Sequence, residues 1–238
     1  MSGAESSPVA IPAGRRRASL RGVTTVPAAL PRRFPAGLLA AYAVWFLVLG
    51  IAPHSRAVWF AENLPIVGIV AALAVLHHRG VRLSNLGYAL AAVLPFLHTL
   101  GGHYTFERVP FGLVTSAFGF ERNHFDRVAH FSVGFYAFAI VEVALARGLV
   151  RGRGVAYLLG VSVIGTVAAV YEIIEWIYAV VEGGDAGAAF LGSQGDPWDA
   201  QKDMLADTLG ALFACAVHRA ARGGGSPGGD GASAGGSG

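Results

Sequence analysis

Acidic and histidine side chains stand where this chain enters its apolar segments. Asp126 and His130 are four residues apart, so a helix would carry both on one face. An apolar run follows them, which predicts that this helix continues into a lipid bilayer. A carboxylate and an imidazole at the start of a membrane helix need a partner, water or a ligand, because burying them unpaired in lipid is costly. We therefore treat this pair as the centre of a candidate site.

Further acids recur in two other apolar segments. Glu172 and Glu175 lie deep in the longest of these segments, where no helix end is available for them to cap. In the last segment three aspartates follow one another every four residues, so they share one helix face. Carboxylates and imidazoles without thiols suit a hard or borderline divalent cation, or a general acid and base pair. The candidate catalytic residues are Asp126, His130, Glu172, Glu175, Asp203 and Asp207.

Two smaller sets complete the candidate site. A divalent metal is the cofactor that suits these side chains, with possible ligands at His98, His130, Glu172, Glu175 and Asp207. The residues expected to bind substrate are polar or aromatic and lie near segment ends. They are Glu62, Asn63, His103, Tyr104, Gln194 and Asp199.

Some acids near the segment ends also have a structural interpretation. Asp126 can cap its own helix and pair with Arg127 or Arg122. Asp196 is expected to be the N-cap of the last helix, with Pro197 as its first residue, because that pairing is favoured where helices start. For these residues capping competes with a role in a site.

The other ends of the apolar segments carry few ionisable groups. Glu142 is the one acid within that half of the segments, and we expect it to pair with Arg147. His77, His78 and His218 lie at those ends, where we expect them to snorkel toward the interface or to be solvated. The candidate chemistry is therefore concentrated on one side of the membrane.

The composition is that of an integral membrane protein. Of 238 residues 54% are hydrophobic and only 14% charged, and the mean hydropathy is +0.53. The arginines flank apolar segments, where they set topology, so the pI of 9.3 does not indicate a nucleic-acid partner. One cysteine, Cys215, excludes an intrachain disulfide and a cysteine-based metal site.

Six segments can span a bilayer, which predicts an all-α, polytopic bundle of six transmembrane helices. The chain divides into a disordered tail over 1–35, a membrane domain over 36–220 and a Gly/Ser-rich disordered tail over 221–238. The spans are expected at 36–52, 58–76, 83–100, 126–145, 155–181 and 204–217, the last lengthening to 197–219 if it starts at the proline.

The basic residues set the orientation of these six spans. Thirteen lie on the side that holds both termini, against five on the other, so both termini are expected in the cytoplasm. Five of the six spans then bring ionisable or amide groups to the outer leaflet. That grouping predicts a water-accessible cavity that opens outward.

Three stretches carry a family resemblance. Residues 125–131 (FDRVAHF), 171–176 (YEIIEW) and 192–211 resemble the YjdF-like family of small, uncharacterised bacterial inner-membrane proteins, over roughly 35–219. More distantly, the order of these motifs resembles the VanZ-like group, whose named member is linked to glycopeptide resistance. Asp207 stands where that group usually has Asn, and Glu175 where it often has Gln. Neither resemblance implies a known reaction.

Three functions fit the sequence. The first is a membrane enzyme that carries out metal-assisted hydrolysis or transfer on a lipid-linked or cell-envelope substrate, with 101–125 as a lid. The second is a proton- or cation-coupled transporter, although its spans have apolar inner halves. The third is a non-enzymatic envelope-stress or scaffold protein. The sequence leaves the substrate and the oligomeric state open.

Overall fold

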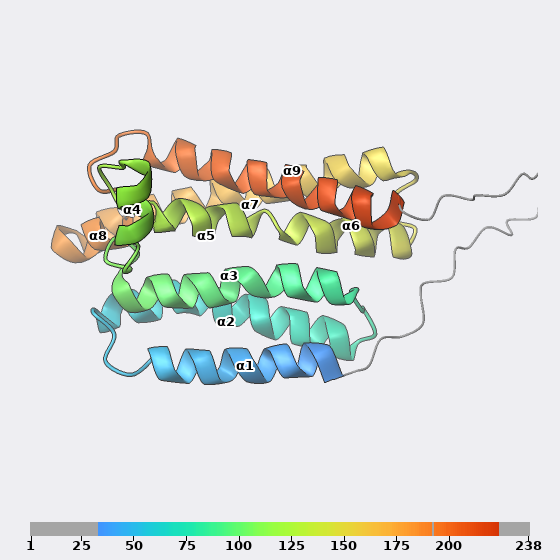
Figure 1. Cartoon of the computed structure of the whole chain (residues 1–238), viewed down its shortest axis with the longest axis horizontal. Coiled ribbons are helices and arrows are strands. Elements are labelled where there is room, and N and C mark those ends of the chain that lie inside the picture. The colour runs from blue at the N-terminus through green and yellow to red at the C-terminus, as the bar shows by residue number, and fades with distance from the viewer. Residues whose placement is uncertain (1–32, 192, 224–238) are drawn as a thin grey trace, which may run out of the picture. The chain divides into compact units, whose positions relative to one another are not determined.

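A computed structural model describes residues 33–191 and 193–223, and this part of the chain is helical without any strand (Figure 1). The expected tails over 1–32 and 224–238 lie outside the described residues. Residues 33–35 and 221–223, assigned to those tails, belong to helices. The helices are α1 (Arg33–Leu49), α2 (Arg56–His78), α3 (Asn85–Tyr104), α4 (Gly112–Phe118), α5 (Phe125–Val133), α6 (Tyr136–Ala146), α7 (Arg153–Glu182), α8 (Gly184–Leu191) and α9 (Asp199–Gly223).

The long helices follow the six expected segments, with α5 and α6 together forming the fourth. Three stretches of the described chain are long and apolar enough to cross a membrane: Arg56–His78, Phe125–Ala146 and Arg153–Glu182. Helix α1 is apolar but shorter. The fold is thus that of an all-α membrane protein.

The helices form two groups that meet along α3. Helix α3 packs on α1 and α2 in one group, whereas α7 and α9 pack on each other and on α6 in the other (Figure 1). Contacts of α3 with α5 and α6 join the groups. We call the end where α2, α5 and α9 begin the site end, and the other the opposite end. Short helices α4 and α8 both lie at the site end (Figure 1).

A glycine contact fixes α5 against α9. The α5–α6 segment is interrupted at Gly134 and Phe135, and Gly134 lies against Gly210 of α9. A Cβ on Gly210 would fall 1.9 Å from the Phe131 carbonyl oxygen, and one on Gly134 would fall 2.4 Å from the Asp207 carbonyl oxygen. Only glycine allows this approach of the two backbones. The crossing holds the first turns of α5 and α9 side by side.

A proline inside α3 gives the two helix groups a polar contact. Pro95 has no N–H, so it cannot donate the helical hydrogen bond to the carbonyl of Ala91. The Tyr136 hydroxyl of α6 donates to that carbonyl instead, at 2.8 Å. The buried carbonyl is thereby satisfied within the membrane domain, as a hydrocarbon environment requires.

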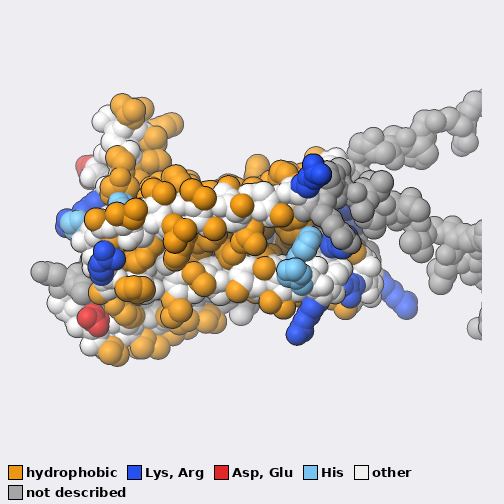
Figure 2. All heavy atoms as spheres, turned by 90° about the horizontal axis from the view of Figure 1, so that it is seen from below, with side chains coloured by type: hydrophobic (Ala, Val, Ile, Leu, Met, Phe, Trp, Pro, Cys, Tyr) orange, Lys and Arg blue, Asp and Glu red, His pale blue; other side chains and the backbone are white. Residues whose placement is uncertain are grey.

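The side chains on the surface suit a bilayer. Figure 2 shows one face on which hydrophobic side chains cover the middle of the helices, while Lys and Arg lie toward the two ends. Large apolar residues on α1 and α7, such as Leu47 and Val181, are largely exposed. A soluble domain would bury such surface, whereas lipid solvates it.

The start of α9 differs from the expectation. The helix begins at Asp199, so Asp196 is not its N-cap and Pro197 is not its first residue. Instead the Asp196 carboxylate accepts a hydrogen bond from the Trp198 N–H at 3.0 Å, in a turn that precedes the helix. This carboxylate also pairs with Arg122 and Lys202.

The opposite end contains one buried acid among the described residues. Glu142 accepts a hydrogen bond from the Ser84 N–H at 3.0 Å and one from Arg222 at 3.1 Å. Its partner is therefore Arg222 of α9, and the expected pair with Arg147 is wrong. His218 is also not solvated there, since it is 2% exposed and packs on the Phe138 ring.

Candidate functional site

Six helices contribute residues to a cavity of about 200 Å³ near the site end, α8 through Leu191 alone. Its wall combines apolar residues with carboxylates and imidazoles drawn from α2, α3, α5, α7 and α9, so the structure brings side chains from separate spans to one place. We call it the acid cavity. Its ionisable lining residues are Glu62, His98, Asp126, His130, Tyr171, Glu175 and Asp207.

His130 occupies the centre of the acids on α5 and α9. Its Nδ1 lies 3.3 Å from the Asp207 carboxylate, and its Nε2 lies 3.6 Å from Asp126 and 3.7 Å from Asp203. The four-residue spacing on each helix produces this arrangement, because it aligns the side chains along one face of α5 and one face of α9. Asp203 and Asp207 are 3% and 1% exposed, so the imidazole has three carboxylates around it and little water.

Three of these groups are placed as ligands of a metal ion would be. Single ligand atoms of Asp126, His130 and Asp203 lie within 4.8 Å of one another. An Nδ1–H bond to Asp207 would leave the Nε2 lone pair facing the two other acids, which is the usual support of a metal-bound histidine. This set overlaps the expected ligands only at His130, with Asp207 in the supporting position.

Two arginines neutralise the acids at the rim of this group. Arg127 makes ion pairs with Asp199 and Asp203, and the Arg122 guanidinium lies 2.7 Å from Asp199. Asp199, expected to bind substrate, is thus held in an ion-pair network. Asp203 is shared between Arg127 and the neighbourhood of His130.

Asp196 completes the rim outside the membrane helices. Its carboxylate lies 2.6 Å from the Lys202 ammonium, and the hydrogen bond from Lys202 lowers the pKa of Asp196 below its usual value. The carboxylate therefore stays ionised to lower pH than a free aspartate.

Gln194 fastens two loops together instead of lining the acid cavity. Its side-chain oxygen accepts from the Asn123 N–H at 3.1 Å, and its amide donates to the Asn123 carbonyl at 2.9 Å. The Asn123 side chain in turn donates to the carbonyls of Glu107 and Val109. These bonds join the segment before α9 to the segment before α5, and so help to set the positions of both helices.

On α2 and α3, one pair lines the acid cavity. The Glu62 carboxylate lies 3.0 Å from His98 Nε2, and Glu62 is 2% exposed. Neighbouring Asn63 instead accepts a hydrogen bond from Thr99, whose hydroxyl also lies 3.1 Å from that of Tyr42. Asn63 therefore ties α1, α2 and α3 together and does not line the acid cavity.

Two other residues expected to bind substrate lie at the end of α3. His103 Nδ1 lies 2.6 Å from the Leu49 carbonyl oxygen, where α1 ends. Tyr104 packs on the apolar cluster formed by Phe106, Val109 and Phe125. Neither residue lines the acid cavity.

The two glutamates of α7 differ in position. Glu175 lines the acid cavity and is 8% exposed, whereas Glu172 is not part of the lining. Tyr171, which the sequence interpretation missed, lines the cavity too, and its four-residue spacing from Glu175 was the available signal. The Tyr171 hydroxyl and Asp207 Oδ1 are buried with no hydrogen-bond partner in the described part of the chain. The Oε1 atom of Glu172 is likewise buried with no hydrogen-bond partner among the described residues.

The segment expected to act as a lid contributes one wall residue. Phe106 lines the acid cavity, and its ring packs near His98 at 4.9 Å between centroids. Helix α4 has no buried residue along its seven positions, and its Leu113 is 91% exposed. The segment thus closes the cavity with Phe106 while α4 projects from the bundle.

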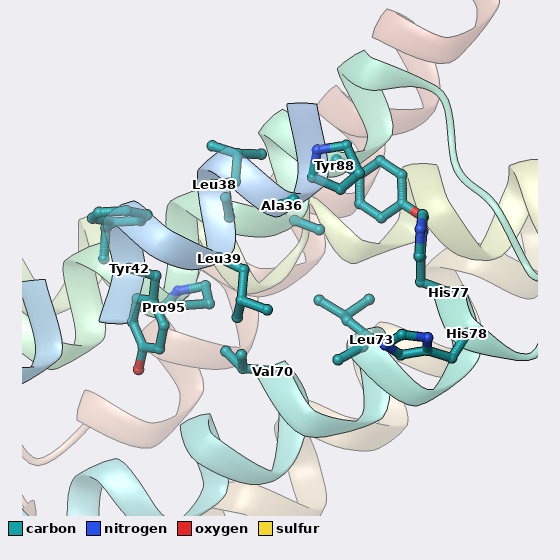
Figure 3. Close-up of a pocket in the computed structure, with 15 residues that line it drawn as sticks. Ala36, Leu38, Leu39, Tyr42, Val70, Leu73, His77, His78, Tyr88 and Pro95 are labelled. Atoms are coloured by element: carbon teal, nitrogen blue, oxygen red, sulfur yellow. The ribbon is translucent and has the colours of Figure 1, made fainter. Parts of the chain in front are cut away.

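A separate pocket lies between α1, α2 and α3 toward the opposite end. Figure 3 shows Leu38, Leu39 and Leu73 around it, with an imidazole bonded to Tyr88 at one side. That imidazole is His77, whose Nδ1 is 2.5 Å from the Tyr88 hydroxyl, so His77 is not simply solvated as expected. The lining of this pocket includes no acid.

The long apolar helices and the apolar surface define an integral membrane protein with several spans. Comparison with known sequences gives its family: residues 34–223 match the model of a predicted membrane protein family, DUF2238, and the chain belongs to that family. It is 37% identical over 165 residues to the inner membrane protein YjdF of Escherichia coli (strain K12), covering 68% of this chain and 78% of the relative. The protein is accordingly an inner-membrane protein.

No solved structure matches the chain. The family assignment bears out the resemblance to YjdF-like proteins, whereas neither match supports the more distant resemblance to the VanZ-like group. The family description states a membrane location and no reaction. Any activity must therefore be argued from the acid cavity.

Proposed function

We propose that this protein is a membrane-embedded enzyme that uses the acid cavity for metal-assisted hydrolysis or group transfer on a cell-envelope substrate. The observation that carries the proposal is the environment of His130. Its imidazole lies between Asp207 on one ring nitrogen and Asp126 and Asp203 on the other. Asp203 and Asp207 are buried and Asp126 is half-buried, and of these Asp203 is paired with Arg127. A capping or packing role does not call for three carboxylates around one imidazole, because each buried one costs desolvation free energy.

The residues divide into distinct roles. Asp126, His130 and Asp203 would hold a divalent cation, and Asp207 would orient the imidazole through Nδ1. A bound cation would supply a Lewis acid and lower the pKa of a coordinated water. Three protein ligands leave a position open, as catalytic metal sites require. Glu175 and the pair of Glu62 with His98, in the same cavity, accept and return protons.

The proposed orientation places the site end at the periplasmic surface, with six spans and both termini in the cytoplasm. The excess of basic residues toward the opposite end supports it, with eight there against five toward the site end among the described residues. Helices α3 and α9 then cross the membrane although they are less apolar than the three candidate spans. His98 of α3 and Asp207 of α9 line the acid cavity, and Asp203 is buried, so lipid does not contact these groups.

A transporter is less well supported than an enzyme. Transport of a proton or cation requires polar groups that continue to the second surface. Among the described residues, the region between the acid cavity and the opposite end is lined by apolar side chains and two tyrosines. Glu142 at that end already has two hydrogen-bond partners and so does not offer a relay.

Metal binding by purified protein tests the proposal. Wild-type protein and His130→Gln, purified in detergent, would be stripped with chelator, incubated with Zn²⁺ or Mn²⁺, and measured by plasma mass spectrometry. We expect about one metal per wild-type chain and at least a tenfold weaker affinity in His130→Gln, because a ligand is lost. Glu182→Gln, on the exposed end of α7, is the matched control and should bind like wild type.

Equal, near-zero occupancy in wild type and in His130→Gln would remove the metal site from the proposal. Folding is checked separately by gel filtration and circular dichroism, so that a loss of metal is not confused with a loss of structure. A six-span topology is tested with reporter fusions at residues 80 and 148, expected in the cytoplasm, and at residue 119, expected in the periplasm.

A further inference from the structure

A second, larger cavity continues from the acid cavity toward the opposite end. It measures about 470 Å³, lies between α2, α3, α6 and α7, and is lined almost wholly by apolar side chains. We call it the apolar cavity. The two cavities adjoin, because four residues line both of them: Ile69, Leu94, Val133 and Val167.

Among the described residues that line the apolar cavity, no polar side chain is free to hold water. Its two hydroxyls belong to Tyr88 and Tyr136, which already bond His77 and the Ala91 carbonyl. A water molecule needs two to four polar partners to occupy a buried site stably. Hydrocarbon, by contrast, fills such a space favourably.

The length of the apolar cavity matches one leaflet. Its lining runs along the chain from Val133 to Ala144, which at the helical rise covers roughly 16 Å. Half of a bilayer core is about 15 Å. A chain with its head at the acid cavity would therefore extend to the opposite end of the bundle.

The apolar cavity has a side open to lipid. Helix α2 packs on α3 and α8, whereas α7 packs on α6, α8 and α9, so the two helices flank the cavity from different groups. Lining residues on both helices are well exposed, with Leu76 at 45%, Val163 at 37% and Val167 at 49%. A lipid chain can enter between α2 and α7 without crossing water.

We propose that the apolar cavity binds one hydrocarbon chain of an amphiphile whose phosphate head occupies the acid cavity through a divalent cation. The proposal rests on the proposed function and names its substrate class. One chain is specified because the two cavities adjoin along a single set of four shared residues. The phosphate head would need the cation because four carboxylates and only two imidazoles line the acid cavity, and carboxylates repel a phosphate.

Photolabelling of protein in nanodiscs tests this. The nanodiscs contain phosphatidylethanolamine and phosphatidylglycerol, and the probe is hexadecyl phosphate with a diazirine near the chain end, added with Zn²⁺. Peptide mass spectrometry should place the label on lining residues of α6 and α7. Val163→Trp, which fills the cavity, should lower this labelling at least fivefold, whereas Val170→Trp, exposed on the same helix outside the lining, should not.

If Val163→Trp does not fold, a second pair of variants makes the same comparison. Ala72→Trp on α2 fills the apolar cavity, and Ala71→Trp places the same side chain one position away, outside the lining. Equal labelling within both pairs, or label confined to residues that face bulk lipid, would show ordinary solvation by the bilayer and overturn the proposal. Equal labelling by a hexadecanol diazirine in chelator would overturn the phosphate head.

The photolabelling experiment can fail independently of the metal-binding experiment that tests the proposed function. Metal affinity of Val163→Trp should equal that of wild type, because the ligands lie in the acid cavity. If His130→Gln binds metal as wild type does, the enzyme proposal fails while the comparison of Val163→Trp with Val170→Trp still decides whether a chain is bound.

Discussion

The two ends of the bundle treat a buried acid differently. At the opposite end, Glu142 accepts hydrogen bonds from the Ser84 N–H and from Arg222, so both of its carboxylate oxygens are used. At the site end, Asp207 is even more buried, yet its Oδ1 has no partner in the described chain and its Oδ2 shares His130 with two other acids. A fully bonded acid stabilises the fold, whereas an incompletely bonded one is available to a ligand.

The glycine crossing determines whether the site end exists, and so gives the largest expected effect. Gly210→Ala would place a Cβ 1.9 Å from the Phe131 carbonyl oxygen, so α5 and α9 must separate. We expect a loss of about 3 kcal/mol or more in unfolding free energy, in the range of severe overpacking. Thermal unfolding in detergent measures it. Gly165→Ala, where a Cβ meets nothing within 4 Å, is the control and should be neutral or slightly stabilising.

At the opposite end we expect an effect on stability alone. Glu142→Ala removes the acceptor of the Ser84 N–H and the partner of Arg222. The expected cost is about 1–3 kcal/mol, the usual result of leaving a buried donor unbonded. Metal affinity should not change, since Glu142 lies at the opposite end of the bundle and the proposed cation ligands lie at the site end. A loss of metal binding in a folded Glu142→Ala protein would break the distinction between the ends.

At the site end we expect a loss of metal affinity with little loss of stability. Asp207→Asn keeps the shape of the side chain and removes a buried charge, so the unfolding free energy should change by less than about 1 kcal/mol or increase. Metal affinity should fall by about 10–100-fold, because the imidazole loses the carboxylate that orients it. Titration with Zn²⁺ against a competing chelator measures this. Strong destabilisation with unchanged affinity would make Asp207 a structural acid like Glu142.

Loss of the Asp196 ion pair at the rim of the site should have the smallest effect, a local change in hydrogen-exchange protection. Since the pKa of Asp196 is lowered in the folded state, its ion pair contributes fully above the unfolded value of about 3.9 and is lost as pH falls through the lower folded value. Protection of the loop at 193–198 from hydrogen exchange should therefore be constant from pH 7 to 5. It should weaken only below about pH 4. In Lys202→Gln that protection should already be reduced at pH 7.

The gathering of acids at one end was predictable, whereas their individual directions were not. Asp126 and His130 share a face by spacing, and the alternating direction of successive spans brings the acidic end of each to the same side. Glu172 and Glu175, however, differ by about 60° around α7, and that difference decides which of them lines the acid cavity. The rotation of a helix about its axis depends on packing partners that a single sequence does not specify.

The loop residues were the least predictable part. Gln194 and His103 bond to backbone groups of distant segments, Asn123 and Leu49 respectively. Such bonds depend on the three-dimensional course of two loops, and no local pattern marks them. Pro197 likewise precedes α9 by two residues, because the ion pairs of Asp196 with Arg122 and Lys202 hold that turn outside the helix.

Pro95 has a consequence beyond its own helix. Replacing it with alanine would let residue 95 donate to the Ala91 carbonyl, and α3 would become more regular. The Tyr136 hydroxyl would then compete for an acceptor that an amide already occupies. A substitution that makes α3 more regular would thereby weaken the hydrogen bond between the two helix groups. The proline that interrupts α3 therefore helps to hold the two groups together.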